Sequence, residues 1–327
     1  MIKRIVLFLM VGIILTGCRG KGKQEFKDER FLFGTYISIT VFHEDAREAR
    51  DAMEAAFDEM ARIDKKFNSH WEGSIIDQLN NDPQRGVELD DEGLMLFEEV
   101  RRIYELTDGK FDITVEPLIQ LWGFGEENPK MPTEVEIEEA IGKIDFNLVE
   151  IEGRRISLKE PLEEIDTGAF LKGYATARAK VAIEEAGVES AFITTISSME
   201  TLGPKAEGPW RIGIQDPNNS REILDIVKLD GQAMGISGDY QTFVEIEGKR
   251  YHHILDPHTG YPVEDRKLVA VICGDALLGD LYSTAFFLMD IEDVFEYVEE
   301  REELDVYIVD AEDKVIMSSG FSNYIEN

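Results

Sequence analysis

The pattern of apolar and polar positions divides the chain into strands and amphipathic helices. Residues 33–42 read F-G-T-Y-I-S-I-T-V-F and alternate apolar with polar side chains, which predicts a strand. Over residues 45–67 apolar side chains recur at every third or fourth position, as they do on one face of a helix. The same spacing predicts helices over 91–106 and 133–144, the first of them stopped by Asp108-Gly109.

The second half of the chain alternates short strands with helices. Strands are predicted over 149–158, 190–196, 210–215, 226–229, 243–254 and 267–273, and helices over 169–185 and 276–289. Gly153 and Gly248 each lie between two alternating segments, where a tight hairpin turn needs a glycine. Hairpins favour antiparallel pairing, so the expected class is α+β, with mostly antiparallel sheets and packed helices.

Size and charge narrow the picture further. The chain has 327 residues, 43% of them hydrophobic, so it can bury a substantial core. No fixed-period repeat or internal linker interrupts residues 29–327, which we expect to form one compact unit or two closely packed lobes. The net charge of −33 would repel a nucleic-acid backbone, so nucleic-acid binding is excluded, and an anionic ligand would need a local cation.

The N-terminus has the pattern of a bacterial lipoprotein signal. Two basic residues precede a short apolar run, and L-T-G-C closes it at Cys18. The run is shorter than the ~20 residues that span a bilayer. We therefore expect a signal peptide over 1–17, lipidation of Cys18, a flexible Gly/Lys-rich tether over 18–28, and an extracytoplasmic, membrane-anchored protein. The alternative is an ordinary cleaved signal in which Cys18 is incidental. Cys273, the other cysteine, lies in a predicted strand and is expected to pack in the core.

Three of the five histidines lie within Y-H-H-I-L-D-P-H-T-G-Y, residues 251–261. Neighbours on a strand point to opposite faces, so only one of His252 and His253 can face a given pocket. The strand runs into D-P-H-T-G, a turn sequence that contains His258. A histidine before such a turn can serve as a general base or bind phosphate, or it can be a buried hydrogen-bonding residue. A metal site is the weaker reading, because adjacent histidines on a regular strand cannot both bind one ion.

Two further segments carry oxygen-bearing or charged side chains at informative spacings. In G-D-L-Y-S-T-A, Asp280 and Thr284 share one helix face with Ser283 beside them, a donor set that suits Mg²⁺. The alternative there is a helix capped by Asp280. In I-D-T-G-A-F-L-K-G-Y a glycine turn opens a helix, so Lys172 and backbone N–H groups could hold phosphate, although Lys172 could equally form an ion pair with Asp166.

Two aromatic residues lie among glycines in residues 109–125. Trp122 and Phe124 are expected in a loop, either exposed to stack on a planar ligand or buried as anchors.

Together, and in this order, these motifs resemble the ApbE family of FAD:protein FMN transferases. F-G-T-Y-I is similar to the family's M-G-T strand with Phe33 at the methionine position, and F-N-S-H-W-E-G-S resembles its F-S-x-Y-x-x-x-S loop with His70 at the usual aromatic position. The other matching segments are F-D-I-T-V-E-P-L-I-Q-L-W-G-F-G, D-T-G-A-F-L-K-G-Y-A, G-P-W-R-I-G-I-Q-D-P, S-G-D-Y, H-H-I-L-D-P-H-T-G-Y-P and G-D-L-Y-S-T-A. The resemblance covers nearly the whole chain after the tether.

The resemblance implies an ApbE-like fold and a Mg²⁺-dependent reaction in which FMN passes from FAD to a Ser or Thr hydroxyl of a partner flavoprotein and AMP is released. It implies a metal site made of Asp280, Ser283, Thr284 and the carbonyl of Ala169, and it makes His253 the candidate catalytic base. The residues implied to contact FAD are Phe33, His70, Lys110, Phe111, Asp112, Asp166, Lys172 and Ile254.

One segment departs from the family pattern. Residues 195–200 read T-I-S-S-M-E where the family usually reads N-I-G-G-[ND]-I, and losing two glycines restricts the backbone and brings side chains toward the ligand. Two alternatives to the transferase therefore stay open: an FAD pyrophosphatase that releases FMN and AMP to water, and a flavin-binding lipoprotein without catalysis.

Overall fold

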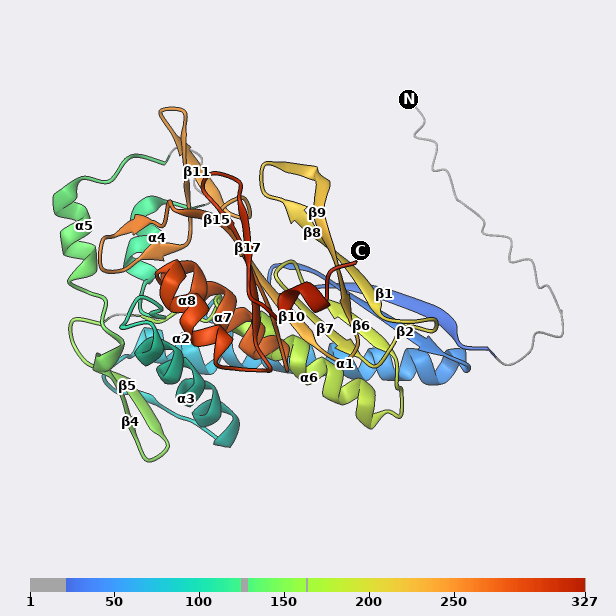
Figure 1. Cartoon of the computed structure of the whole chain (residues 1–327). Helices are drawn as coiled ribbons and strands as arrows, with labels where there is room; N and C mark the ends of the chain where they lie inside the picture. Colours follow the sequence, from blue (N-terminus) through green and yellow to red (C-terminus); the bar gives the residue numbers. More distant parts are fainter. Residues whose placement is uncertain (1–21, 125–128, 163, 327) are drawn as a thin grey trace, which may run out of the picture.

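An antiparallel sheet runs through the middle of the molecule (Figure 1). The computed structural model describes residues 22–124, 129–162 and 164–326. The strands of the sheet are β1 (Gln24–Leu32), β2 (Thr35–His43), β6 (Ala191–Thr194), β7 (Ser198–Leu202), β10 (Ala233–Gly238), β15 (Arg266–Cys273), β16 (Asp305–Asp310) and β17 (Val315–Met317). They pair in the order β1-β2-β6-β7-β10-β15-β16-β17, and every pairing is antiparallel.

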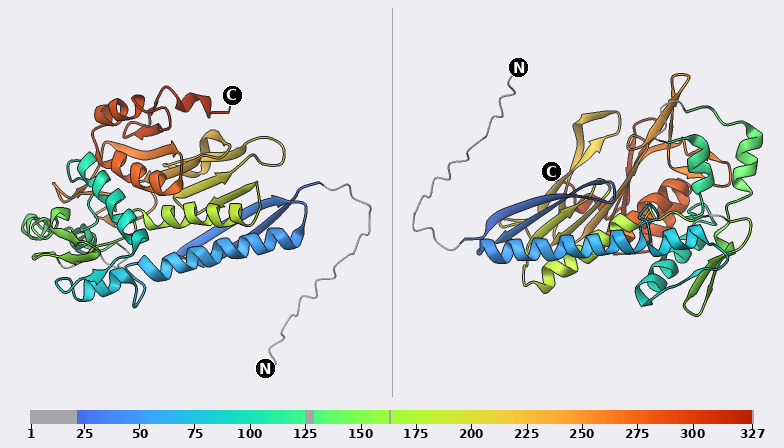
Figure 2. Two further views of the ribbon diagram at one scale, coloured as in Figure 1. Left: turned by 90° about the horizontal axis from the view of Figure 1, so that it is seen from below. Right: turned by 180° about the vertical axis from the view of Figure 1, so that it is seen from behind.

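Three helices cover one face of this sheet: α1 (Ala46–Phe67), α6 (Leu171–Glu185) and α7 (Ala276–Leu288). In Figure 2, α1 and α6 lie side by side along the sheet. The Asp45 side chain caps α1 by accepting from the N–H groups of Arg47 and Glu48, and the apolar stripe of the helix is buried against β2 and α6. Helix α7 is apolar on nearly all sides because it is packed between the sheet and other helices.

A two-stranded ribbon covers the opposite face. It consists of β8 (Trp210–Asp216) and β9 (Asn219–Leu229), and the C-terminal 3₁₀ turn Phe321–Asn323 lies beside it. Alternate residues of the ribbon, Ile214 and Val227 among them, are buried against Met234 and Tyr307 of the sheet. The central strands are therefore buried on both faces.

A smaller lobe sits at one end of the sheet and has its own apolar cluster (left side of Figure 1). It contains α4 (Glu116–Trp122), α5 (Glu134–Ile141), β11 (Phe243–Ile246), β12 (Lys249–His252), β13 (Leu255–Asp256) and β14 (Tyr261–Pro262). Trp122 is fully buried at its centre, its indole N–H donates to the carbonyl of Gly260 at 2.9 Å, and its ring packs on Tyr251 and Tyr261. The indole ties α4 to the turn that follows the paired histidines.

The remaining elements border the helical face and connect the parts described above. They are α2 (Ile75–Asn81), β3 (Val87–Glu88), α3 (Asp91–Leu106), the 3₁₀ turn η1 (Phe146–Leu148), β4 (Val149–Glu152), β5 (Arg155–Leu158) and α8 (Ile291–Glu299). Strands β3, β5 and β4 form a small antiparallel sheet, with β4 and β5 joined at Gly153 (φ 62°) as predicted.

The α+β class and the antiparallel pairing are confirmed, and three local predictions are corrected. Residues 24–28 were expected in the tether but belong to β1, whose polar sequence reflects its exposed position at the sheet edge. In residues 243–254 the turn predicted at Gly248 (φ 81°) is confirmed, and the correction concerns the strand end: β12 ends at His252, so residues 253 and 254 lie beyond it. Trp122 ends helix α4, which begins at Glu116 with Pro117 in its first turn, where a loop was expected.

The N-terminal predictions concern residues that the structure does not describe. The signal segment 1–17 and Cys18 lie outside the described residues. Within the described part, no helix is both long enough and apolar enough to span a membrane. Cys273 is buried in β15, as predicted.

Candidate functional site

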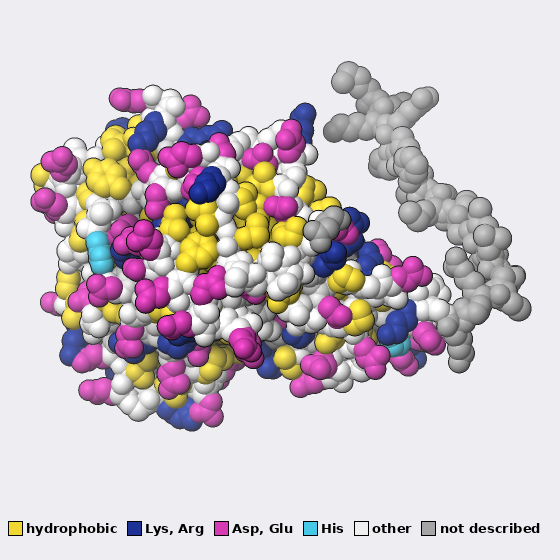
Figure 3. Space-filling model, viewed as in Figure 1, with side chains coloured by type: hydrophobic (Ala, Val, Ile, Leu, Met, Phe, Trp, Pro, Cys, Tyr) yellow, Lys and Arg dark blue, Asp and Glu magenta, His cyan; other side chains and the backbone are white. Residues whose placement is uncertain are grey.

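A cavity of about 590 Å³ opens where the smaller lobe meets the end of the main sheet. All eight residues predicted to contact flavin line it: Phe33, His70, Lys110, Phe111, Asp112, Asp166, Lys172 and Ile254. His253, Ala169, Asp280 and Thr284 line the same cavity, although these residues are spread over more than half of the chain. Acidic side chains are spread over the face of the molecule seen in Figure 3. Lys172 and Lys110, the latter paired with Asp290 at 3.3 Å, supply local positive charge at the cavity.

The first wall of the cavity comes from the turn between β1 and β2. Phe33 has φ 52° and is followed by Gly34 at φ 72°. The N–H of Phe33 donates to the buried Asp64 carboxylate at 3.2 Å, which stabilises a backbone conformation that a bulky residue rarely adopts. This strained turn presents the Phe33 ring to the cavity.

A second wall follows helix α3. The carboxylate of Asp112 accepts from the N–H and hydroxyl of Thr114, both at 2.7 Å, and from the N–H of Phe146 at 2.9 Å. Burial raises the pKa of Asp112, and these donors oppose the shift. Asp112 therefore holds the segment Lys110–Asp112 in place, and Lys110 reaches the cavity beside it.

The glycine turn before α6 forms the third wall. Asp166 accepts from the Ser69 hydroxyl at 2.8 Å and from the N–H of Gly168 at 2.7 Å. The Lys172 ammonium donates to the Gly168 carbonyl at 2.8 Å, and among the described residues no ion pair joins it to Asp166. The ion-pair alternative for Lys172 is therefore wrong, and its charge is directed to the cavity.

The two adjacent histidines have different surroundings. His253 lines the cavity, and its Nδ1 donates to the carbonyl of Thr242 at 3.1 Å, which leaves the lone pair on Nε2. Burial lowers the pKa of His253 to about 4, so the ring is neutral at neutral pH. The ring of His252 lies between the Val263 carbonyl (2.6 Å) and the N–H of Ile254 (3.2 Å), so it braces the turn. His258 is exposed.

Asp280 projects from α7 into the end of the cavity and is only 4% exposed. One carboxylate oxygen accepts from the N–H of Gly173 at 2.6 Å, and the other accepts from the Ser198 hydroxyl. Burial raises the pKa of Asp280, and the nearby Lys172 charge opposes that shift. Asp280 does not cap α7: Asp275 does, accepting from the N–H of Leu278 at 3.0 Å.

The donors around Asp280 fit a hard cation. The Gly173 N–H would reach the Ala169 carbonyl in a continued helix, but it is turned to Asp280, so the carbonyl is available to a ligand. Asp280, Thr284 and the Ala169 carbonyl all border the cavity, and they are the oxygen donors that Mg²⁺ prefers. Within the described residues no cluster of three or more His, Cys, Asp or Glu side chains is placed to bind a metal.

Ser283 is not among the residues that line the cavity. Its hydroxyl donates back to the Asp280 carbonyl at 3.2 Å and accepts from Ser237 at 3.0 Å. The helix turn between Asp280 and Thr284 points it into the packed interface with β10, so the direct ligand role predicted for it does not fit.

The structure adds residues that the motifs did not identify. Ser197 and Ser237 line the cavity, and Glu116 and Gln241 do as well. Burial and the charge of Asp166 raise the pKa of Glu116 to about 7. Glu116 and Ser237 lie inside the matching motifs F-D-I-T-V-E-P-L and S-G-D-Y, although the sequence assigned them no role. Ser197 lies in T-I-S-S-M-E, which was expected to bring side chains toward the ligand.

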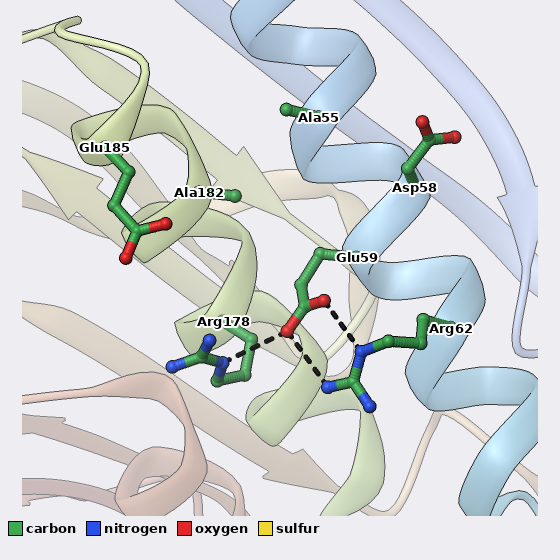
Figure 4. A pocket seen from close by; sticks show the side chains of 7 residues that line it. All are labelled: Ala55, Asp58, Glu59, Arg62, Arg178, Ala182 and Glu185. Atoms are coloured by element: carbon green, nitrogen blue, oxygen red, sulfur yellow. Dashed lines mark hydrogen bonds and ion pairs between the residues drawn. The ribbon is translucent and has the colours of Figure 1, made fainter.

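A second, more open hollow lies between α1 and α6. Figure 4 shows Glu59 between Arg62 and Arg178, and the Glu59 carboxylate binds both guanidinium groups, at 2.8 and 3.2 Å. Both arginines of this hollow are paired with Glu59 and the cluster lies on an open surface, so we assign no chemistry to it.

Comparison with known proteins agrees with the geometry of the large cavity. A sequence profile of the ApbE family matches residues 33–308, which span both lobes and all walls of the cavity. The chain belongs to the ApbE family. The ApbE family is thus confirmed on most of the chain, and the ApbE-like fold is confirmed by a crystal structure: the ApbE protein of Thermotoga maritima superimposes with a TM-score of 0.85 at 33% identity, over 93% of this chain and 100% of that one.

Relatives within the ApbE family carry the name of a transferase. The FAD:protein FMN transferase of Escherichia coli K12 is 31% identical over 68% of this chain and 67% of its own length. That of Vibrio cholerae O395 is 26% identical over 96% of both chains. A flavin transferase ApbE from Vibrio cholerae shares the fold, with a TM-score of 0.81. The predicted enzyme class, a transferase, is confirmed.

Proposed function

We propose that this protein transfers FMN from FAD to a Ser or Thr hydroxyl of a partner flavoprotein and releases AMP. The observation that carries the proposal is the meeting, in one cavity, of His253 with its Nε2 lone pair, the Lys172 ammonium and the oxygen donors Asp280 and Thr284. The names of its relatives support FAD as the donor substrate. A base, a cation and a hard-metal donor set are what phosphoryl transfer needs.

The bonds change as follows. The acceptor hydroxyl oxygen forms a bond to the phosphorus of the FMN half of FAD, and the bond from that phosphorus to the bridging oxygen breaks. AMP departs with the bridging oxygen, and the hydroxyl proton goes to Nε2 of His253. Lys172 offsets the negative charge of the pyrophosphate. Nδ1 of His253 stays bonded to the Thr242 carbonyl, which keeps the ring oriented throughout.

Asp280, Thr284 and the Ala169 carbonyl would hold Mg²⁺, which when bound neutralises charge on the pyrophosphate. The remaining walls bind the flavin nucleotide: Phe33 and His70 offer rings, and the buried residues Phe111 and Ile254 shape the apolar wall.

The test mixes the purified protein with FAD, Mg²⁺ and a candidate acceptor domain, and follows AMP by chromatography and the acceptor by intact mass. We expect the acceptor to gain one FMN for each AMP formed. AMP and free FMN without an acceptor adduct would establish the pyrophosphatase instead. FAD binding without AMP would establish a binding protein. Asp280→Ala is the control that should abolish AMP formation.

We propose further that the protein is anchored by a lipid on Cys18 outside the cytoplasmic membrane. The support is the sequence L-T-G-C after a short apolar run. Mass spectrometry of the mature N-terminus should show a diacylglyceryl-type modification on Cys18, and Cys18→Ala should release the protein from the membrane fraction. An unmodified Cys18 in the membrane-derived protein would contradict the proposal.

A further inference from the structure

The segment that departs from the family pattern forms a closed turn. The N–H of Thr195 donates to the Ser198 carbonyl at 2.9 Å, and the N–H of Ser198 donates back to the Thr195 hydroxyl at 3.0 Å. The Ser197 carbonyl accepts from the N–H of Ile236 at 2.8 Å, which fastens the turn to β10. The backbone of Ser198 is therefore fixed on both sides, and its residue is fully buried.

The Ser198 hydroxyl donates to the Asp280 carboxylate, while the Gly173 N–H donates to the other oxygen. The two donors come from β7 and α6, and the carboxylate comes from α7. Helices α6 and α7 pack closely, since a Cβ on Gly173 would lie 2.2 Å from the Ala276 carbonyl. Helix α7 packs as closely on β10, the strand paired with β7, since a Cβ on Gly235 would lie 2.0 Å from the Gly279 carbonyl. Both oxygens of Asp280 are thus held by groups that cannot easily move.

We propose that Ser198 is a positioning residue for the metal site: its hydroxyl fixes the orientation in which the Asp280 carboxylate meets the divalent cation. The inference rests on the proposed function, which places the cation at Asp280. The inference also assigns a role to Ser198, which stands where the family usually has glycine, because a glycine at position 198 could not donate this hydrogen bond.

The physical reason is the geometric demand of the cation. Mg²⁺ requires near-ideal octahedral geometry at ~2.0–2.1 Å, so a carboxylate that can rotate binds it less well. Groups that hydrogen-bond to a metal ligand typically change metal affinity by ~10–100-fold when they are removed. After loss of the Ser198 hydroxyl, Asp280 would keep the Gly173 N–H and the interaction with the Ser197 side chain, and the oxygen that Ser198 holds would turn more easily.

The experiment measures the dissociation constant of Mn²⁺ as a Mg²⁺ substitute, by electron paramagnetic resonance on the full protein without FAD. We expect Ser198→Ala and Ser198→Gly each to weaken Mn²⁺ binding by about 10–100-fold. Ser190→Ala is the matched control: Ser190 is a buried serine directly before β6 whose hydroxyl donates to the Pro204 carbonyl at 2.7 Å, and its loss should leave Mn²⁺ binding unchanged.

Kinetics supply a second readout that a general loss of stability would not reproduce. In Ser198→Ala the Mg²⁺ concentration for half-maximal rate should rise by the same factor, while kcat at saturating Mg²⁺ should return to within a few fold of wild type. FAD affinity without metal should not change. Thermal unfolding of both Ser198 variants and of Ser190→Ala identifies any variant that fails to fold, and Ser198→Gly then serves if Ser198→Ala does not.

The outcomes distinguish the positioning role of Ser198 from the metal site at Asp280. If wild type binds Mn²⁺ in a manner that Asp280→Ala abolishes, but folded Ser198 variants bind it within twofold of wild type, the positioning role is wrong and the transferase proposal stands. If wild type shows no Asp280-dependent Mn²⁺ binding, both the metal site and the role of Ser198 are overturned.

Discussion

Nδ1 of His253 donates to the carbonyl of Thr242 at 3.1 Å, and the backbone N–H of His253 donates to the same oxygen. Thr242 lies at the start of the β11–β12 hairpin and His253 just beyond its end. The hairpin therefore fixes the tautomer of the histidine as well as its position. A neutral imidazole with the proton on Nδ1 can accept a proton only at Nε2, as a general base must.

Replacing His253 by Asn should separate this hydrogen bond from basicity. The amide nitrogen of Asn reaches about as far as Nδ1 and can still donate to Thr242, but nothing replaces Nε2. We expect kcat to fall by about 10²–10⁴-fold with an FAD dissociation constant within a few fold of wild type. Single-turnover AMP release and fluorescence titration with FAD measure the two quantities. A kcat within threefold of wild type would remove His253 from the reaction.

The pH profile should show a histidine that titrates well below its ordinary value. Burial lowers the pKa of His253 to about 4, and Lys172 and His252 act in the same direction. The base works when neutral, so kcat/KM should hold on the acid side until the pH approaches this value. Stopped assays across the acid range measure the pH at which kcat/KM falls to half. A midpoint near the ordinary histidine pKa of ~6.5 would argue against the buried ring as the base.

We also expect FAD affinity to depend on pH, because Glu116 lines the cavity. Burial and the Asp166 charge raise its pKa to about 7, with Glu164 adding to the shift and His70 opposing it. The carboxyl is neutral below this value and negative above it, where it repels the pyrophosphate of FAD. FAD affinity should therefore fall by about threefold to tenfold as the pH rises through 7, since one nearby charge is worth roughly 1 kcal/mol.

The control for that effect is a matched pair of variants. Glu116→Gln is neutral at every pH and should make FAD affinity nearly independent of pH across this range. Glu138→Gln changes the net charge equally from the exposed surface of α5 and should keep the wild-type dependence. An unchanged pH dependence in Glu116→Gln, measured by fluorescence titration, would assign the effect to another group.

The segments predicted well from sequence are those whose periodicity is long and regular. The helix predicted over 91–106 has the same bounds as α3. The helix predicted over 45–67 is α1, which begins one residue later because Asp45 is its N-cap. Strand β1 escaped prediction because an edge strand exposed on its outer side carries few apolar residues. The glycines around Trp122 predict a loop, but Gly123 is the left-handed C-cap that ends helix α4.

The site residues, too, could be predicted where they are close in the sequence and not where only packing joins them. Asp280 and Thr284 could be paired from sequence because they are one helix turn apart, and Ser283 was misplaced because only packing against Ser237 decides which way it faces. Ser198 could not be linked to Asp280, since the contact joins residues 82 positions apart in the chain. Contacts between distant segments depend on how the elements pack, which periodicity does not specify.

Trp122 allows a test of how the smaller lobe supports the cavity. Trp122→Phe removes the hydrogen bond to the Gly260 carbonyl and part of the buried ring between Tyr251 and Tyr261. We expect the free energy of unfolding to fall by about 1–3 kcal/mol, from the lost packing and from an unpaired carbonyl. Because Gly260 belongs to the turn that follows His253, FAD affinity should weaken as well.

Trp71→Phe is the matched control, since the Trp71 side chain is 43% exposed and its loss should change stability by less than ~0.5 kcal/mol. Urea unfolding of both variants, with and without FAD, gives the comparison. If Trp122→Phe is destabilised but binds FAD as wild type does, the indole stabilises the lobe without shaping the cavity. If it is as stable as Trp71→Phe, the lobe does not depend on the hydrogen bond to Gly260.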